Sequence, residues 1–187
     1  AGPWRLASLP QFLRLGSQFT AGPNRPDPLN WPHQMTDPTL SAPLSPDELA
    51  AIASLYEAGQ YLTAFEATKP HGEFTKWSGP EARVMAGRLA YHLGGFRTSR
   101  LLINLAWRQA PENPEVNYYY AYNVLQKRGP WGAWQFLSEC GELNSPTDDT
   151  RSSWYALIGQ VAGLMRDFET AEKWLRKALD VWPDSPW

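Results

Sequence analysis

The chain has 187 residues, of which 43% are hydrophobic and 13% aromatic, a composition typical of a folded globular protein. Its formal net charge of −2 gives no global positive field that would favour nucleic acid. Cys140 is the only cysteine, which excludes an internal disulfide and indicates a reducing compartment. Because no apolar run approaches the roughly 20 residues that span a bilayer, we predict a cytoplasmic protein without a membrane span.

Residues 1–44 are predicted to form a proline-rich, mostly non-regular arm. Proline fixes φ and removes the backbone donor, so its recurrence here favours an extended, turn-rich chain. Two roles stay open for the arm, which either lies across the first helices or docks a partner. Three arginines and no acidic residue precede Asp27, which is also typical of a targeting peptide, so a processed or organellar origin is an alternative.

From Ser45 onward the pattern changes to helical periodicity, and we predict an all-α domain over residues 45–187. Ser45 suits an N-cap, Pro46 the first helical position, and Asp47 and Glu48 the first turn. Similar helix-sized segments follow, separated by glycine or proline. No alternation of apolar and polar residues indicates a strand.

The predicted helices form four superimposable pairs. The small residue after the turn in each second helix recurs at intervals of 35, 34 and 38 residues, at Ala64, Ser99, Ala133 and Ala171. The second helices are expected to open at Tyr61, Phe96, Pro130 and Phe168, and prolines are expected to end them at Pro111, Pro146 and Pro183. The close-contact positions of the first helices are Ile52, Gly87, Ala121 and Gly159. Small residues are needed there because packed helices approach within about 8–10 Å.

This pattern resembles the tetratricopeptide repeat family, and weakly its multi-repeat bacterial members. The best-matching copy carries Tyr155, Ile158, Gly159, Ala162, Ala171, Leu175, Ala178 and Pro183. The resemblance implies a right-handed α–α superhelix of helical hairpins, with approximate repeats 45–78, 80–113, 114–147 and 152–185. Pro70 and Gly72 make the first copy degenerate, and the four extra residues before the last copy are expected in a loop. Pentatricopeptide repeats, which read RNA, generally carry a basic groove that the near-neutral charge argues against.

A search for catalytic or ligand-binding motifs finds none. His33, His71 and His92 are widely spaced and form no metal-ligand pair, and no glycine-rich phosphate loop is present. We expect Cys140 to fill the core. The sequence therefore predicts no enzyme, no cofactor and no bound metal.

The family resemblance implies that the first helices line a concave groove that binds a peptide or helix of a partner protein. The residues expected in this groove are Arg88, Tyr91, His92, Tyr118, Tyr119, Tyr122, Gln126 and Gln160. Tyr118 and Tyr122 share one helix face at i, i+4, while Tyr120 points toward the packing side. Alternatively, the tyrosines fill the seam between repeats. A clamp for a terminal carboxylate is not expected, because Arg88 is nearly the only charged group there.

The last predicted helix lacks a polar capping partner, which repeat proteins normally have. We expect an exposed apolar surface at Leu175, Ala178, Leu179 and Trp182, covered by further sequence, a partner, or self-association with a second copy. The leading hypothesis is a protein-interaction scaffold. Two alternatives remain: an N-terminal scaffold of a longer protein with a catalytic domain beyond Trp187, for example a papain-like peptidase, or a structural subunit of a larger assembly.

Overall fold

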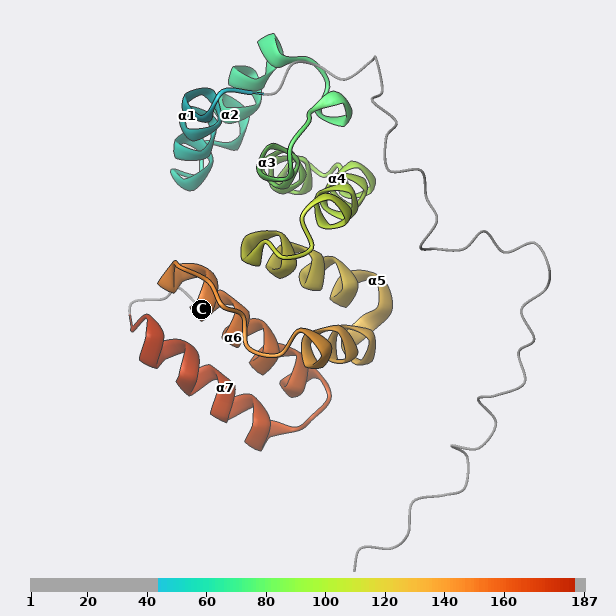
Figure 1. Ribbon diagram of the computed structural model, residues 1–187, viewed down its shortest axis with the longest axis vertical. Helices are drawn as coiled ribbons and strands as arrows, with labels where there is room; N and C mark the ends of the chain where they lie inside the picture. Colours follow the sequence, from blue (N-terminus) through green and yellow to red (C-terminus); the bar gives the residue numbers. More distant parts are fainter. Residues whose placement is uncertain (1–43, 184–187) are drawn as a thin grey trace, which may run out of the picture. The chain divides into compact units, whose positions relative to one another are not determined.

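The computed structural model describes residues 44–183, which lie in one compact unit. Within this range the regular structure is entirely helical, with seven α-helices and no strand (Figure 1). The helices are α1 (Pro46–Glu57), α2 (Tyr61–Thr68), α3 (Pro80–His92), α4 (Phe96–Gln109), α5 (Pro114–Cys140), α6 (Asp148–Leu164) and α7 (Phe168–Val181). The all-α prediction is confirmed. The predicted arm of residues 1–44 lies outside the described range except for its last residue.

Helix α1 begins where its sequence predicts. Ser45 is the N-cap, and its hydroxyl accepts a hydrogen bond from the backbone N–H of Glu48 at 3.3 Å. The carboxylate of Glu48 accepts in return from the Ser45 backbone N–H at 2.8 Å. This reciprocal capping box satisfies two backbone donors that the helix itself leaves without partners.

Helix α5 is interrupted at Gly129 and therefore provides two helical segments. Gly129 has φ 72° and ψ −175°, a conformation that only glycine adopts without strain. Pro130 follows directly and has no N–H to continue the ladder. The described chain thus contains four helix pairs in sequence order: α1 with α2, α3 with α4, the two segments of α5, and α6 with α7 (Figure 1).

The helices within the pairs touch at the predicted small residues. All four small positions of the second helices are buried, at Ala64, Ser99, Ala133 and Ala171. A Cβ added to Gly87 would lie 2.8 Å from Cδ1 of Ile103, and one added to Gly159 would lie 2.8 Å from Cγ of Leu175. Such distances leave no room for a side chain. The interpretation of Gly87 and Gly159 as close-contact positions is confirmed.

Successive pairs join through side chains between neighbouring helices. Helix α3 contacts α1 on one side and α5 on the other, so the first helices of three pairs lie next to one another. Tyr120 of α5 stacks on Trp107 of α4 at 4.3 Å between ring centroids and lies 5.0 Å from the ring of Phe136. As predicted, Tyr120 therefore faces the packing side.

Two local predictions are wrong, and a third holds in part. Helix α5 ends at Cys140, with Gly141 at φ 67° as its cap, rather than at Pro146. Residues 141–147 form the predicted loop before the last pair, but helix α6 already begins at Asp148, where acidic side chains favour the helix N-terminus. Cys140 is exposed and does not fill the core, because Leu137 takes the buried position in the last turn of α5.

No helix between residues 44 and 183 combines the length and the apolar character needed to cross a bilayer.

Two glycines of α6 offer a matched test of the close packing. In Gly159→Ala the new Cβ would meet Cγ of Leu175 at 2.8 Å and the carbonyl oxygen of Ala171 at 3.1 Å. We expect this variant to lose about 1–3 kcal/mol of unfolding free energy through overpacking. In Gly163→Ala the atom nearest to the new Cβ is 3.8 Å away, so the side chain fits. Because alanine lowers the chain entropy of the unfolded state, this variant should gain at most about 1 kcal/mol of unfolding free energy. Urea unfolding followed by circular dichroism measures both, and equal effects would contradict the close contact.

Candidate functional site

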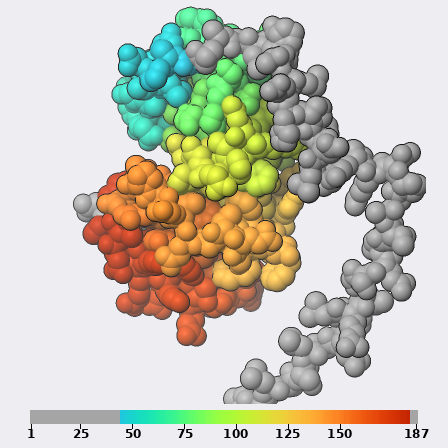
Figure 2. All heavy atoms as spheres, viewed as in Figure 1, coloured from blue at the N-terminus to red at the C-terminus, as the bar shows by residue number. Residues whose placement is uncertain are grey.

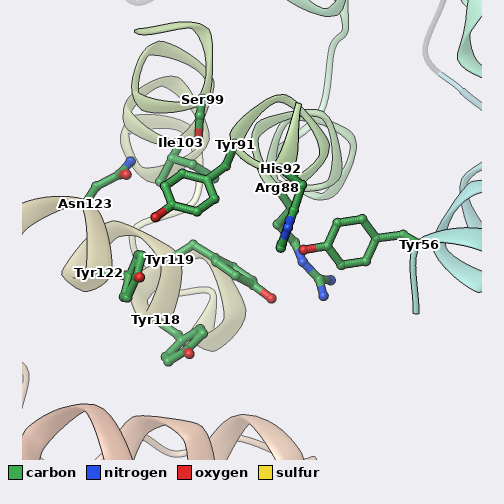
Figure 3. A pocket seen from close by; sticks show the side chains of 10 residues that line it. All are labelled: Tyr56, Arg88, Tyr91, His92, Ser99, Ile103, Tyr118, Tyr119, Tyr122 and Asn123. Atoms are coloured by element: carbon green, nitrogen blue, oxygen red, sulfur yellow. The ribbon is translucent and has the colours of Figure 1, made fainter. Parts of the chain in front are cut away.

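A cavity of about 290 Å³, which we call the tyrosine pocket, opens between α1, α3, α4 and α5 (Figure 3). Its lining residues are Tyr56, Arg88, Tyr91, His92, Ser99, Ile103, Tyr118, Tyr119, Tyr122 and Asn123. The first helices of three successive pairs supply eight of these ten side chains, and α4 supplies Ser99 and Ile103. The walls are therefore mostly aromatic rings held on rigid helices.

Helical spacing brings the pocket side chains onto common faces. Arg88, Tyr91 and His92 lie at i, i+3 and i+4 on α3, and Tyr118 and Tyr122 lie at i and i+4 on α5. The ring of Tyr91 meets that of Tyr122 edge-on at 6.3 Å, across the space between the two helices (Figure 3). The two faces thus converge on one cavity.

Arg88 holds the three helices together at the pocket. Its guanidinium carbon lies 4.3 Å from the ring centroid of Tyr56 on α1 and 5.0 Å from that of Tyr119 on α5. Nη2 donates to Oε1 of Glu57 at 2.6 Å, and Nη1 lies 3.8 Å from Oε1 of Glu115. The side chain is only 15% exposed, so these contacts act in a partly desolvated place. Burial alone would lower the pKa of Arg88, but Tyr119, Tyr56 and Glu57 outweigh it and raise the pKa.

Two buried donors at the pocket have no partner in the described part of the chain. They are Nε of Arg88 and Nδ2 of Asn123. Leaving a buried donor without an acceptor costs about 1–3 kcal/mol, and the great majority of such groups in native proteins are satisfied. Both residues line the tyrosine pocket, but the two nitrogen atoms themselves are buried, so an acceptor bound there reaches them only after the side chains turn toward it.

Four of the pocket tyrosines have raised pKa values. Burial raises the pKa of Tyr118 to about 12, and burial also raises the pKa values of Tyr119 and Tyr56. The pKa of Tyr122 is raised by burial and by a hydrogen bond with Tyr91. These hydroxyls are therefore suited to hydrogen bonding and not to acting as bases.

A second hollow of about 280 Å³ continues the tyrosine pocket, since Arg88, Tyr118 and Tyr119 line both. We call it the acidic mouth. Its other lining residues are Glu57, Glu115, Asp149, Thr150, Ser153 and Trp182. Figure 2 shows the surface hollowed between the cyan and teal residues of α1 and α2 and the orange residues at the start of α6. We call the tyrosine pocket and the adjoining acidic mouth together the groove.

The carboxylates of the acidic mouth act on one another. Burial raises the pKa of Glu115, Arg88 opposes this as the largest charge effect, and Glu81, Asp149 and Glu57 raise the pKa further. The lining of the mouth itself carries three carboxylates and one guanidinium.

The structure brings most of the predicted groove residues together. Six line the tyrosine pocket: Arg88, Tyr91, His92, Tyr118, Tyr119 and Tyr122. Gln126 hydrogen-bonds to Tyr122 without lining a cavity of the groove, and Gln160 is exposed on α6 and lines neither hollow. The prediction that the tyrosines fill the seam also has support, because Tyr118 and Tyr122 pack partly against the α5–α7 core.

Two further groove residues follow from the sequence, and others do not. Helical spacing predicts that Tyr56 faces the groove, and Asn123 is expected to offer hydrogen bonds to a peptide; both line the tyrosine pocket. The carboxylates of the acidic mouth come from the ends of α1, α5 and α6. Only the tertiary structure brings these three helix ends together.

The predicted surface at the end of the chain is partly buried. Leu175 and Leu179 are 42% and 45% exposed, and Trp182 is half-buried at the acidic mouth. Ala178, however, is only 4% exposed, and its carbonyl accepts a hydrogen bond from the Ser152 hydroxyl at 3.0 Å. The placement of Ala178 on the open face is wrong, because it faces α6. Self-association through Leu175 and Leu179 stays a prediction.

Between residues 44 and 183, no group of three or more histidine, cysteine or acidic side chains is arranged to hold a metal ion. His33 lies outside the described residues.

Comparisons with known proteins do not identify the chain. No known family matches it, and no curated protein shows detectable similarity to it. The tetratricopeptide resemblance therefore stays a prediction, and function must be argued from the groove itself.

The raised pKa of Tyr118 predicts a specific alkaline instability. The unfolded side chain ionises near the ordinary tyrosine pKa of 10.0, whereas the folded one ionises at about 12, so stability falls as pH rises through this window. We expect Tyr118→Phe to remove this pH dependence. The unfolding free energy of the variant, measured against that of the native chain, should therefore be about 1 kcal/mol higher at about pH 11 than at about pH 8. Thermal unfolding at both pH values measures the change, and an unchanged difference would show that Tyr118 ionises freely in the folded state.

Proposed function

We propose that the chain is a protein-interaction scaffold of the tetratricopeptide kind, which holds a peptide segment or helix of a partner protein in the groove. Four helix pairs with small residues at their contacts support the repeat assignment. The groove walls come from α1, α3 and α5, the first helices of successive pairs. This is the surface that such repeats use for binding, according to the resemblance.

The dimensions of the groove suit a peptide, whose successive side chains can enter the two hollows, better than one compact small molecule. Each hollow is at or below the lower limit of roughly 300–1,000 Å³ typical of small-molecule sites. The two hollows are joined through Arg88, Tyr118 and Tyr119. Tyrosines also offer rigid contact area at a low cost in side-chain entropy, and they are enriched among residues that dominate binding energy.

The observation that carries the proposal is the aromatic lining of the tyrosine pocket. Five tyrosines and His92 line it, and all six come from α1, α3 and α5, the first helices of successive pairs. A segment lying along the groove would place its apolar side chains against these rings, which offer a large contact area on rigid helices.

A library of random peptides displayed on phage, selected against the full chain, tests this proposal. We expect the selection to enrich specific peptide sequences. The enriched peptides should bind Tyr122→Ala at least about 30-fold more weakly than the native chain, which corresponds to a side chain that contributes about 2 kcal/mol to the binding free energy. Fluorescence anisotropy measures the affinities.

The matched control is Trp131→Ala, which removes an exposed aromatic ring of α5 outside the groove. This variant should bind like the native chain. Circular dichroism confirms that each variant folds. Selection of no peptide, or peptides that bind Tyr122→Ala and the native chain equally, would refute the groove as the binding site.

A further inference from the structure

The charge of the groove is unevenly distributed along its length. The tyrosine pocket contains Arg88 and no carboxylate, whereas Glu57, Glu115 and Asp149 line the acidic mouth. Arg88 lies between the two hollows, and its Nη2 is engaged by Glu57 at 2.6 Å. One end of the groove is therefore apolar and aromatic, and the other carries an excess of negative charge.

Two of the mouth carboxylates are only weakly compensated by Arg88. Its Nη1 lies 3.8 Å from Oε1 of Glu115, which is beyond a normal hydrogen bond, and the Glu115 side chain is 46% exposed. Asp149 is exposed on the first turn of α6 and acts on the carboxyl of Glu115 from across the mouth. Both carboxylates keep oxygens that can accept hydrogen bonds from a ligand.

We propose that the groove selects a basic peptide segment: a Lys or Arg side chain of the partner enters the acidic mouth, while a neighbouring apolar side chain fills the tyrosine pocket. This inference rests on the proposed function and specifies its ligand. A cation in the mouth would lie between the oxygens of Glu115 and Asp149 and beside the aromatic ring of Tyr118, which lines both hollows. Trp182 adds a second aromatic wall at the rim.

An acidic ligand fits the same geometry poorly. To reach Arg88, a carboxylate would have to compete with Glu57 at 2.6 Å and would face the negative charges of Glu115 and Asp149. Like charges brought together at an interface oppose binding. A basic ligand meets only the positive charge of Arg88, which is paired with Glu57, whereas three carboxylates line the mouth.

Three pools of short fluorescent peptides, with both ends capped to remove terminal charge, test the inference on the full chain. The pools share randomised apolar and aromatic positions and differ only in fixed residues that are Lys, Gln or Glu. We expect the Lys pool to bind about five- to tenfold more tightly than the Gln pool, as two or three exposed ion pairs allow, and the Glu pool to bind most weakly. The advantage of the Lys pool should shrink at high sodium chloride, because salt screens exposed charges.

The deciding variant is Glu115→Gln with Asp149→Asn, which removes two negative charges and leaves the Arg88–Glu57 pair intact. It should lower the affinity of the Lys pool to that of the Gln pool. The control is Glu139→Gln with Glu169→Gln, which removes two exposed carboxylates outside the groove and changes the net charge equally. This control should keep the preference for lysine.

The outcomes separate the two proposals. If none of the pools binds the native chain, or if binding is insensitive to Tyr122→Ala, the proposed function fails. If the pools bind through the groove but the Gln or Glu pool binds as tightly as the Lys pool, only the inference of a basic ligand is overturned. Retention of the lysine preference in Glu115→Gln with Asp149→Asn would overturn it as well.

Discussion

The close approach of the two helices in each pair is the constraint on which the rest of the structure depends. At Gly87 and Gly159 the partner helix occupies the space that a Cβ would need. Elsewhere alanine or serine at the contact keeps the pair tight. Large side chains pack around these close contacts, both between pairs, as Trp107 and Tyr120 do, and within them, as Tyr155 and Trp174 do. Close contacts at small residues and ring packing around them together hold neighbouring helices in place.

The groove is a consequence of this arrangement. Once α1, α3 and α5 lie next to one another, side chains on one face of each helix must meet over a common space. A charged residue in that space needs compensation, and Arg88 finds it in two rings and a carboxylate from the neighbouring helices. One side chain of α3 thus contacts the helix before it and the helix after it.

Much of the helical organisation could be predicted from the sequence because it follows from local rules. The capping box at Ser45 and the close-contact glycines are encoded by residues a few positions apart or by the repeat period. The end of α5 was predicted at Pro146, but Gly141, with its positive φ, ends the helix before that proline. The start of α6 was placed too late for the same reason. The acidic mouth could not be predicted, since Glu57, Glu115 and Asp149 converge only after three helix ends meet.

The two donors without partners bear on how the groove would admit a ligand. Nε of Arg88 and Nδ2 of Asn123 are buried, so neither can meet an acceptor until the side chain that carries it turns. A ligand that engages them would therefore have to rearrange the wall of the groove locally, at the junction between α3 and α5, and would not dock on it as on a rigid template.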